Sequence, residues 1–167
     1  MKRLLAAAAT ASLAAAAFLA APAPAVAADR TCRGTLGAVA VDDLVVPAGR
    51  SCVLDGTRVR GNITIERNAS LRASGIRVDG NIQGQRFMRG NVVRSIVWGN
   101  IQLEQGGAAW LQSNRVDGDI QLFSNRNPTY VGKNRIGGNL QCTTNSYLPL
   151  GGLNVVGGNK EDQCRRL

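Results

Sequence analysis

The chain has 167 residues, with 20 Lys or Arg, 11 Asp or Glu and no His, so its net charge is +9. This length predicts one domain. The absence of histidine excludes a Ser-His-Asp or Cys-His triad and histidine-ligated zinc. Glycine occurs 20 times and aromatic residues make up 4% of the chain, which is typical of a chain that turns often.

Residues 1–27 have the pattern of a secretory signal peptide. Two basic residues precede an apolar run at 4–21, and residues 25–27 have the small-x-small form of a cleavage site. An uncleaved membrane anchor is the alternative, but the run is 18 residues long and mostly alanine. Cleavage leaves residues 28–167 as one domain with 18 basic and 11 acidic residues, a net charge of +7. We expect a secreted protein, which is extracellular, or periplasmic if the source has an outer membrane.

A motif of the form apolar-x-Gly-(Asn/Asp)-apolar recurs along the remaining chain. Successive repeat glycines are spaced by 19, 19, 19, 20 and 20 residues, and they are Gly61, Gly80, Gly99, Gly118, Gly138 and Gly158. An earlier copy at residues 42–46 lacks the glycine. Helical repeats need about 33 to 47 residues, and leucine-rich repeats need a consensus that is absent here. A unit of this length with alternating apolar residues fits one turn of a parallel β-helix.

Positions counted from the repeat glycine predict the direction of each side chain. Positions −2, +2 and +4 hold mostly Val, Ile and Leu and should face the core, whereas −3, −1 and +3 should face outward. The Asn and Asp residues at position +1 predict a hydrogen-bonded ladder at a bend. The repeat glycine before them would allow a positive φ at this bend and fit where there is no room for a Cβ. A ligand-binding polar row is the alternative. The ladder residues are Asp43, Asn62, Asn81, Asn100, Asp119, Asn139 and Asn159.

The pattern predicts an all-β solenoid, a single-stranded parallel β-helix of about six to seven coils. The Gly-Asn-(Ile/Leu)-Gln copies and the ending at 138–142 and 157–164 resemble small secreted bacterial proteins of the right-handed parallel β-helix type. The resemblance covers about residues 32–167. It implies the fold, its right-handed winding and a secreted location, and it carries no activity. Pectate-lyase-like enzymes share this architecture, but their calcium-binding acidic clusters are absent from the sequence, so no catalytic residue is carried over.

Four cysteines allow three pairings. Cys32 and Cys52 are 20 residues apart, and Cys142 and Cys164 are 22 residues apart, which is about one coil in each case. Neighbouring coils about 4.8 Å apart suit a disulfide, whose Cα atoms are about 4.4–6.8 Å apart, whereas crossed pairings would span several coils. We therefore predict Cys32–Cys52 and Cys142–Cys164 as staples of the two ends. A metal site or redox pair is the alternative, but no Cys-x-x-Cys spacing is present.

Outward positions −3 and −1 form an arginine-rich strip that Ile96 and Trp98 interrupt at its middle. An outward indole can stack on a sugar while guanidinium and amide groups bind its hydroxyl or carboxylate groups. The alternative is that Trp98 packs between Arg77 and Arg115 in cation–π contacts. The candidate ligand-binding residues are Trp98, Arg58, Arg77, Arg115, Arg135, Gln83, Gln102 and Gln121.

The positive charge favours an acidic polysaccharide, a cell-envelope polymer or a membrane surface as partner. A solvated face with Arg–Asp pairs across coils is the alternative. Nucleic acid is not expected, because secretion and the lack of aromatic-rich binding modules argue against it. We expect a non-enzymatic structural or binding module that is monomeric and has no cofactor, no metal and no transmembrane segment after cleavage.

Two other functions remain open. In a small polysaccharide hydrolase or lyase-like enzyme, Asp79 and Asp117 would be the catalytic carboxylates. They are two coils apart in one outward column, or about 9.6 Å, at the upper edge of the separation in inverting glycosidases. Salt bridges to Arg77 and Arg115 explain the two acids more simply. The third function is a self-assembling solenoid, which stapled ends make less favourable.

Overall fold

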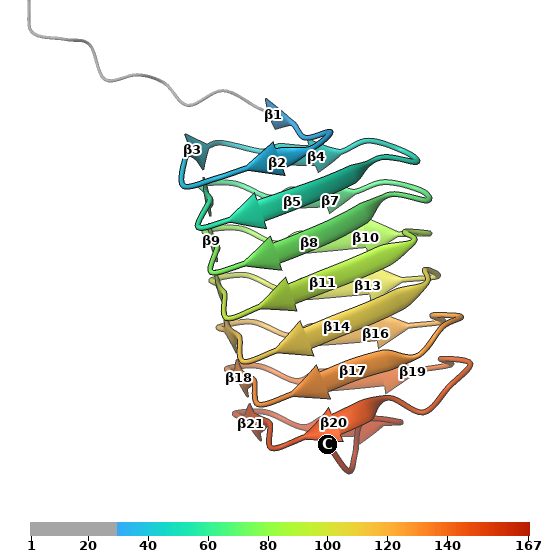
Figure 1. Ribbon diagram of the computed structural model, residues 1–167. Helices are drawn as coiled ribbons and strands as arrows, with labels where there is room; N and C mark the ends of the chain where they lie inside the picture. Colours follow the sequence, from blue (N-terminus) through green and yellow to red (C-terminus); the bar gives the residue numbers. More distant parts are fainter. Residues whose placement is uncertain (1–29) are drawn as a thin grey trace, which may run out of the picture.

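The computed structural model describes residues 30–167, which form one parallel β-solenoid of about seven coils (Figure 1). Each coil contributes a strand to each of three sheets, of eight, seven and seven strands, and no helix occurs in the described residues. The all-β prediction is confirmed. The signal peptide predicted for residues 1–27 lies outside the described residues.

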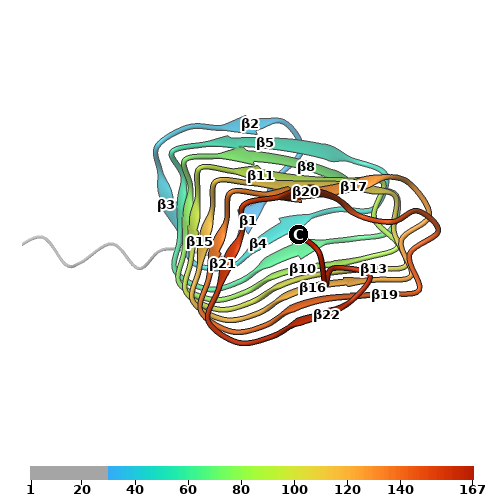
Figure 2. The same ribbon diagram turned by 90° about the horizontal axis from the view of Figure 1, so that it is seen from below.

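The three sheets, called A, B and C, are the sides of a three-sided prism (Figure 2). Sheet A contains β1 (Arg30–Thr31), β4 (Leu44–Val46), β7 (Ile63–Ile65), β10 (Ile82–Gln85), β13 (Ile101–Glu104), β16 (Ile120–Phe123), β19 (Leu140–Thr143) and β22 (Lys160–Asp162). Sheet B contains β2 (Thr35–Leu36), β5 (Ser51–Asp55), β8 (Ser70–Ser74), β11 (Arg89–Val93), β14 (Ala108–Gln112), β17 (Thr129–Gly132) and β20 (Leu150–Gly152). Sheet C contains β3 (Ala40–Val41), β6 (Arg58–Val59), β9 (Arg77–Val78), β12 (Ile96–Val97), β15 (Arg115–Val116), β18 (Arg135–Ile136) and β21 (Val155–Val156).

The winding of the chain is right-handed. In Figure 1 the front strands β8, β11 and β14 run to the left, and the more distant strands β13, β16 and β19 run to the right. The chain descends from β1 at the top to its C-terminus at the bottom. A chain that advances in this way while turning follows a right-handed helix.

The core is a stack of like residues, as the repeat predicts. Strand pairing places Ile63, Ile82 and Ile101 in register on sheet A, and each is fully buried. Positions −2 and +4 are buried in the same way, except in the last coil, where Val156 is partly buried and Asp162 is exposed. Each coil alone covers little apolar surface, so the core depends on the stacking of neighbours.

The predicted ladder occupies the corner between sheets C and A. The side-chain oxygen of each ladder residue before Asn159 accepts a hydrogen bond from the backbone N–H one coil further on, as between Asn81 N and Asn62 Oδ1 at 2.9 Å and between Asn100 N and Asn81 Oδ1 at 2.8 Å. The contact needs only an acceptor, which explains why Asp119 can replace asparagine in this column.

Two reasons were expected for the repeat glycines, a positive φ and a lack of space for a Cβ, and the first is wrong. None of them has a positive φ, which in the described residues occurs at other glycines such as Gly56 and Gly75. They are required because there is no space: a Cβ at Gly80 would lie 2.6 Å from both Asn62 Oδ1 and the carbonyl oxygen of Gly61.

Two interior ladders occupy the other corners, and the sequence analysis missed both. At the corner between sheets B and C, the buried side chains of Asn114, Asn134 and Asn154 bond in series. At the corner between sheets A and B, Asn125 and Asn145 do the same, and the side chain of Gln163 ends the series. Each buried amide also donates to a strand carbonyl oxygen, as Asn134 Nδ2 does to Leu111 O at 2.9 Å.

Both predicted disulfides are confirmed. Cys32–Cys52 and Cys142–Cys164 join neighbouring coils, with Cα separations of 5.5 and 5.2 Å, and all four cysteines are buried. They lie at the first and last coils, where a solenoid otherwise frays. At the C-terminal end Leu167 also packs against the core.

Candidate ligand-binding surfaces

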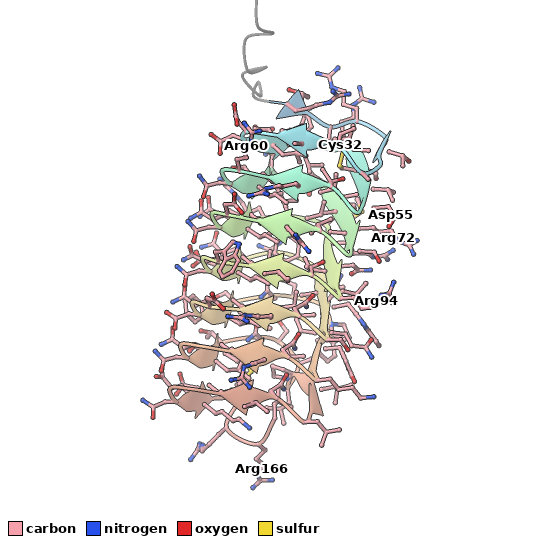
Figure 3. The ribbon with its side chains drawn as sticks, turned by 90° about the vertical axis from the view of Figure 1, so that its left-hand side faces the viewer. Cys32, Asp55, Arg60, Arg72, Arg94 and Arg166 are labelled. Atoms are coloured by element: carbon pink, nitrogen blue, oxygen red, sulfur yellow. A yellow bond between two sulfur atoms is a disulfide. The ribbon has the colours of Figure 1, made fainter. Side chains whose placement is uncertain are left out.

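The arginine-rich strip lies on the outer face of sheet C. Strand pairing aligns Arg58, Arg77, Ile96, Arg115 and Arg135 in one column across five strands. These arginines are exposed, and Figure 3 views this face directly. The predicted column is therefore present.

Trp98 lies on this face and is 50% exposed. The guanidinium carbon of Arg115 is 5.6 Å from the centre of the indole ring, within the range of a cation–π contact. Within the described residues Arg77 makes no such contact, so the predicted two-sided sandwich is reduced to one side. A hollow on sheet C between Arg115, Asp117 and Arg135 has a volume of about 270 Å³.

Asp79 and Asp117 both form ion pairs on sheet C. Asp79 pairs with Arg58 at 3.2 Å, not with Arg77 as the sequence suggested, and Asp117 pairs with Nε of Arg115 at 3.0 Å. A third pair joins Arg60 and Asp42 at 3.9 Å. These contacts give both candidate carboxylates a structural partner, and the proposed catalytic role gains no support from them.

The glutamine column lies on sheet A, beyond the corner that carries the exposed ladder. Gln83, Gln102 and Gln121 are in register on β10, β13 and β16. Gln102 donates to Glu104 at 2.7 Å, and Gln121 donates to Gln141 at 2.8 Å. The predicted binding surface is thus divided between two sheets, and two of its three glutamines are engaged with neighbouring side chains.

Sheet B carries a hollow that the sequence analysis did not find. It extends over four consecutive strands, β5, β8, β11 and β14, and its volume is about 680 Å³. Strand register places Val53, Arg72, Asn91 and Trp110 in one outward column along its length. Asp55 and Arg94 line the side next to sheet C, and Figure 3 shows them with Arg72 projecting from one edge of the molecule.

Trp110 forms the end wall of this hollow and is held in a fixed orientation. The ring of Tyr130 stacks on it with a centroid distance of 4.1 Å and an interplanar angle of 13°. The indole N–H donates to Gln112 Oε1 at 3.0 Å. Because Tyr130 follows in the next coil, the opposite indole face is on the side of Asn91 and the hollow. An aromatic ring that is already ordered loses little conformational entropy when it binds a ligand.

The arginines of this hollow differ from those on sheet C in their partners. The three ion pairs within residues 30–167 are all on sheet C, and none involves Arg72 or Arg94. Arg94 donates to the hydroxyl of Ser74 at 2.8 Å, which orients it beside the hollow. The hollow on sheet B therefore has two arginines that form no ion pair, although the carboxylate of Asp55 lines the same hollow.

A signal for this surface was present in the repeat. Arg72, Asn91 and Trp110 each lie 11 residues after a repeat glycine. The later coils are one residue longer, so Tyr130 lies 12 residues after Gly118. Extending the alignment past position +4 would have revealed the first part of the column.

Residues 30–167 contain no cluster of three His, Cys, Asp or Glu side chains that could hold a metal ion. The same residues include no helix with the length and apolar character needed to cross a membrane. No protein-family model, curated protein or solved structure matches this chain.

Proposed function

We propose that the protein is an exported, non-enzymatic β-solenoid that binds an acidic polysaccharide in the hollow on sheet B. The observation that carries the proposal is the fixed, half-covered ring of Trp110 at the end of a hollow that two unpaired arginines line. Sugar sites combine an aromatic surface with a few polar groups in this way.

The chemistry of the hollow suits a sugar polymer that carries acid groups. The open indole face would pack against the C–H groups of one sugar ring. The forked N–H donors of Arg72 and Arg94 suit carboxylate oxygens. The amide of Asn91 and the carboxylate of Asp55 can bond to hydroxyl groups.

The direction of the hollow suits a linear polymer. It crosses successive strands of sheet B, which lie about 4.8 Å apart. Outward side chains therefore repeat at that spacing along the solenoid axis, and repeat proteins use such extended surfaces for binding.

Export is supported by two independent features. The sequence at 1–27 has the form of a secretory signal peptide. Two disulfides join neighbouring coils, and disulfides persist mainly outside the cytosol. The resemblance to small secreted bacterial β-helix proteins favours the same location.

A monomeric state is part of the proposal. The first coil carries Arg30 and Arg33, and the last carries Arg165 and Arg166. Because Asp42 and Asp43 lie in the first coil and Glu161 and Asp162 in the last, charge alone does not oppose end-to-end stacking. The two disulfides, which fasten both end coils to their neighbours, support the monomer.

The proposal predicts different effects for the two tryptophans. Replacing Trp110 with alanine should weaken binding of the recognised polysaccharide by roughly tenfold or more, because an aromatic anchor at the wall of the site is lost. Trp98→Ala, which removes an indole of similar exposure on sheet C, is the matched control and should change affinity by less than about twofold. Affinity electrophoresis in carboxylated, sulfated, phosphorylated and neutral polysaccharides measures both.

If Trp98→Ala weakened binding more than Trp110→Ala did, the binding site would be the arginine-rich strip on sheet C. Turnover of a bound polysaccharide that is abolished by Asp117→Asn would replace the non-enzymatic function with the hydrolase or lyase alternative.

A further inference from the structure

The corner between sheets A and B holds a second hollow, of about 310 Å³, and three arginines from different coils line it. Arg67 precedes β8, Arg86 precedes β11 and Arg126 precedes β17. All three are exposed, and none forms an ion pair within residues 30–167. Three like charges around one hollow repel one another unless an anion lies between them.

Two acidic residues, Glu66 and Glu104, are close in sequence to residues that line this corner, and both carboxylates hydrogen-bond to other groups. Glu66 accepts a hydrogen bond from the backbone N–H of Ala48 at 2.8 Å. Glu104 accepts one from Gln102 at 2.7 Å. Neither carboxylate forms an ion pair with the three arginines, so their guanidinium groups are available to a further anion.

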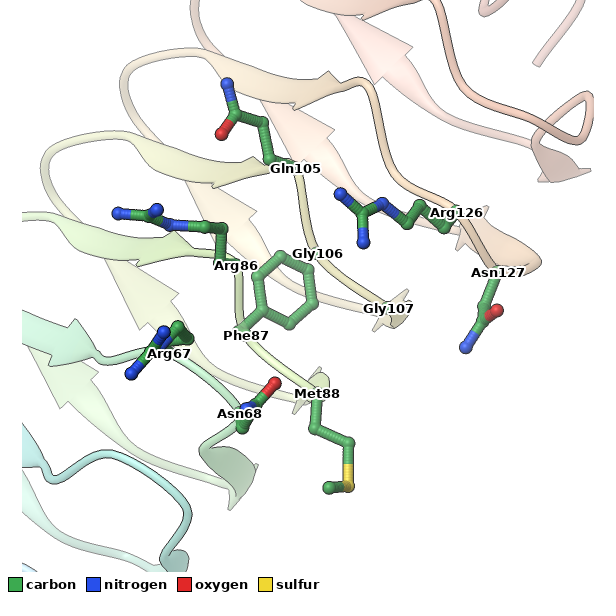
Figure 4. Close-up of a pocket in the computed structure, with 10 residues that line it drawn as sticks. All are labelled: Arg67, Asn68, Arg86, Phe87, Met88, Gln105, Gly106, Gly107, Arg126 and Asn127. Atoms are coloured by element: carbon green, nitrogen blue, oxygen red, sulfur yellow. The ribbon is translucent and has the colours of Figure 1, made fainter.

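The base of the hollow is apolar and closely packed. Phe87 is buried, and its ring lies at the centre of the close-up in Figure 4, with Arg86 and Arg126 beside it. A Cβ at Gly106 would collide with this ring, and a Cβ at Gly107 would collide with the carbonyl oxygen of Met88. These glycines keep the two loops in contact, and the packed base supports the positions from which the arginines extend.

We propose that this corner binds a tetrahedral oxyanion, a sulfate or phosphate ester on the polymer. A carboxylate has two oxygens and is satisfied by one guanidinium fork, whereas a sulfate or phosphate ester presents three free oxygens to three guanidinium groups. The amides of Asn68, Gln105 and Asn127 line the same hollow and supply further donors. The polymer that carries this group is taken from the proposed function. The anion site itself does not depend on that function.

The test compares two triple variants that lose the same charge. Arg67→Gln, Arg86→Gln and Arg126→Gln together should weaken binding of dextran sulfate or phosphorylated dextran by roughly 100-fold. The control combines Arg33→Gln, Arg165→Gln and Arg166→Gln at the two ends, and it should weaken binding by less than about threefold. Which of the two dextrans binds more tightly to the native protein identifies the ester.

Three outcomes would overturn the anion site. The two triple variants could weaken binding equally, the corner variant could have no effect, or polygalacturonate could depend on the corner arginines as strongly as dextran sulfate does. Trp110→Ala separates this inference from the proposed function. If the corner variant loses binding and Trp110→Ala does not, the anion site stands and the sugar site on sheet B fails; the reverse result removes the anion site alone.

Discussion

Asn134→Asp should destabilise the protein by about 3 kcal/mol or more, because a buried amide would become a buried carboxylate. Asn134 is 1% exposed. Its Nδ2 donates to Leu111 O at 2.9 Å and to Asn154 Oδ1 at 3.0 Å. A carboxylate cannot donate a hydrogen bond to Leu111 O or to Asn154 Oδ1. Its oxygens would therefore face these two acceptors in an interior without water.

The matched control is Asn81→Asp in the ladder between sheets C and A. Asn81 is partly exposed, and its Oδ1 accepts from Asn100 N at 2.8 Å, a bond that a carboxylate retains. Its Nδ2 also donates to Asn62 Oδ1 at 3.1 Å, and a carboxylate loses this bond at an exposed corner where water can replace it. Asp119 already stands in this column one coil after Asn100. The loss should be within about 1 kcal/mol. Urea unfolding of both variants measures the difference, and equal losses would contradict the distinction between the exposed and interior ladders.

Removing the C-terminal disulfide should cost about 3 kcal/mol, since the bond closes a loop of this size in the unfolded chain. The two cysteines are 22 residues apart, and Cys142→Ala with Cys164→Ala leaves no polar group in the core. The loss should be concentrated in the last coil. There, β22 pairs only with β19, and Gln163 bonds to Asn145 at the end of an interior ladder.

Hydrogen exchange tests where the effect falls. The variant should lose protection at β22 and keep it at β7 and β10, because each coil contacts only its neighbours. Cys32→Ala with Cys52→Ala is the counterpart at the first coil and should leave β22 protected. Uniform loss of protection in either variant would show that the solenoid unfolds as one unit.

Much of the fold was predictable because one column repeats without exception after the first copy. No repeat glycine has space for a Cβ beside the preceding coil, so only glycine fits at this position. The repeat can therefore be recognised in the sequence from the spacing of these glycines. The interior ladders were not visible, because their columns change along the chain. The corner between sheets B and C reads Thr57, Ile76 and Ser95 before it becomes asparagine.

The candidate site was less predictable. Trp98 stands next to a repeat glycine and was found for that reason, whereas Trp110 stands on sheet B, 11 residues after that glycine. The partners of individual arginines depend on rotamers, which the repeat does not determine. Sequence spacing therefore gave the arginine column but assigned Asp79 to Arg77, and the structure pairs Asp79 with Arg58.

The most direct test of polysaccharide binding on sheet B uses the two tryptophans of the chain as reporters. In ¹⁵N-labelled protein each gives one indole N–H signal, and Trp98→Phe assigns them. Titration with a fragment of the bound polysaccharide should shift the Trp110 signal, whose N–H is held by Gln112 at 3.0 Å, and leave Trp98 unchanged. A shift of the Trp98 signal alone, or binding that moves neither signal, would contradict the account.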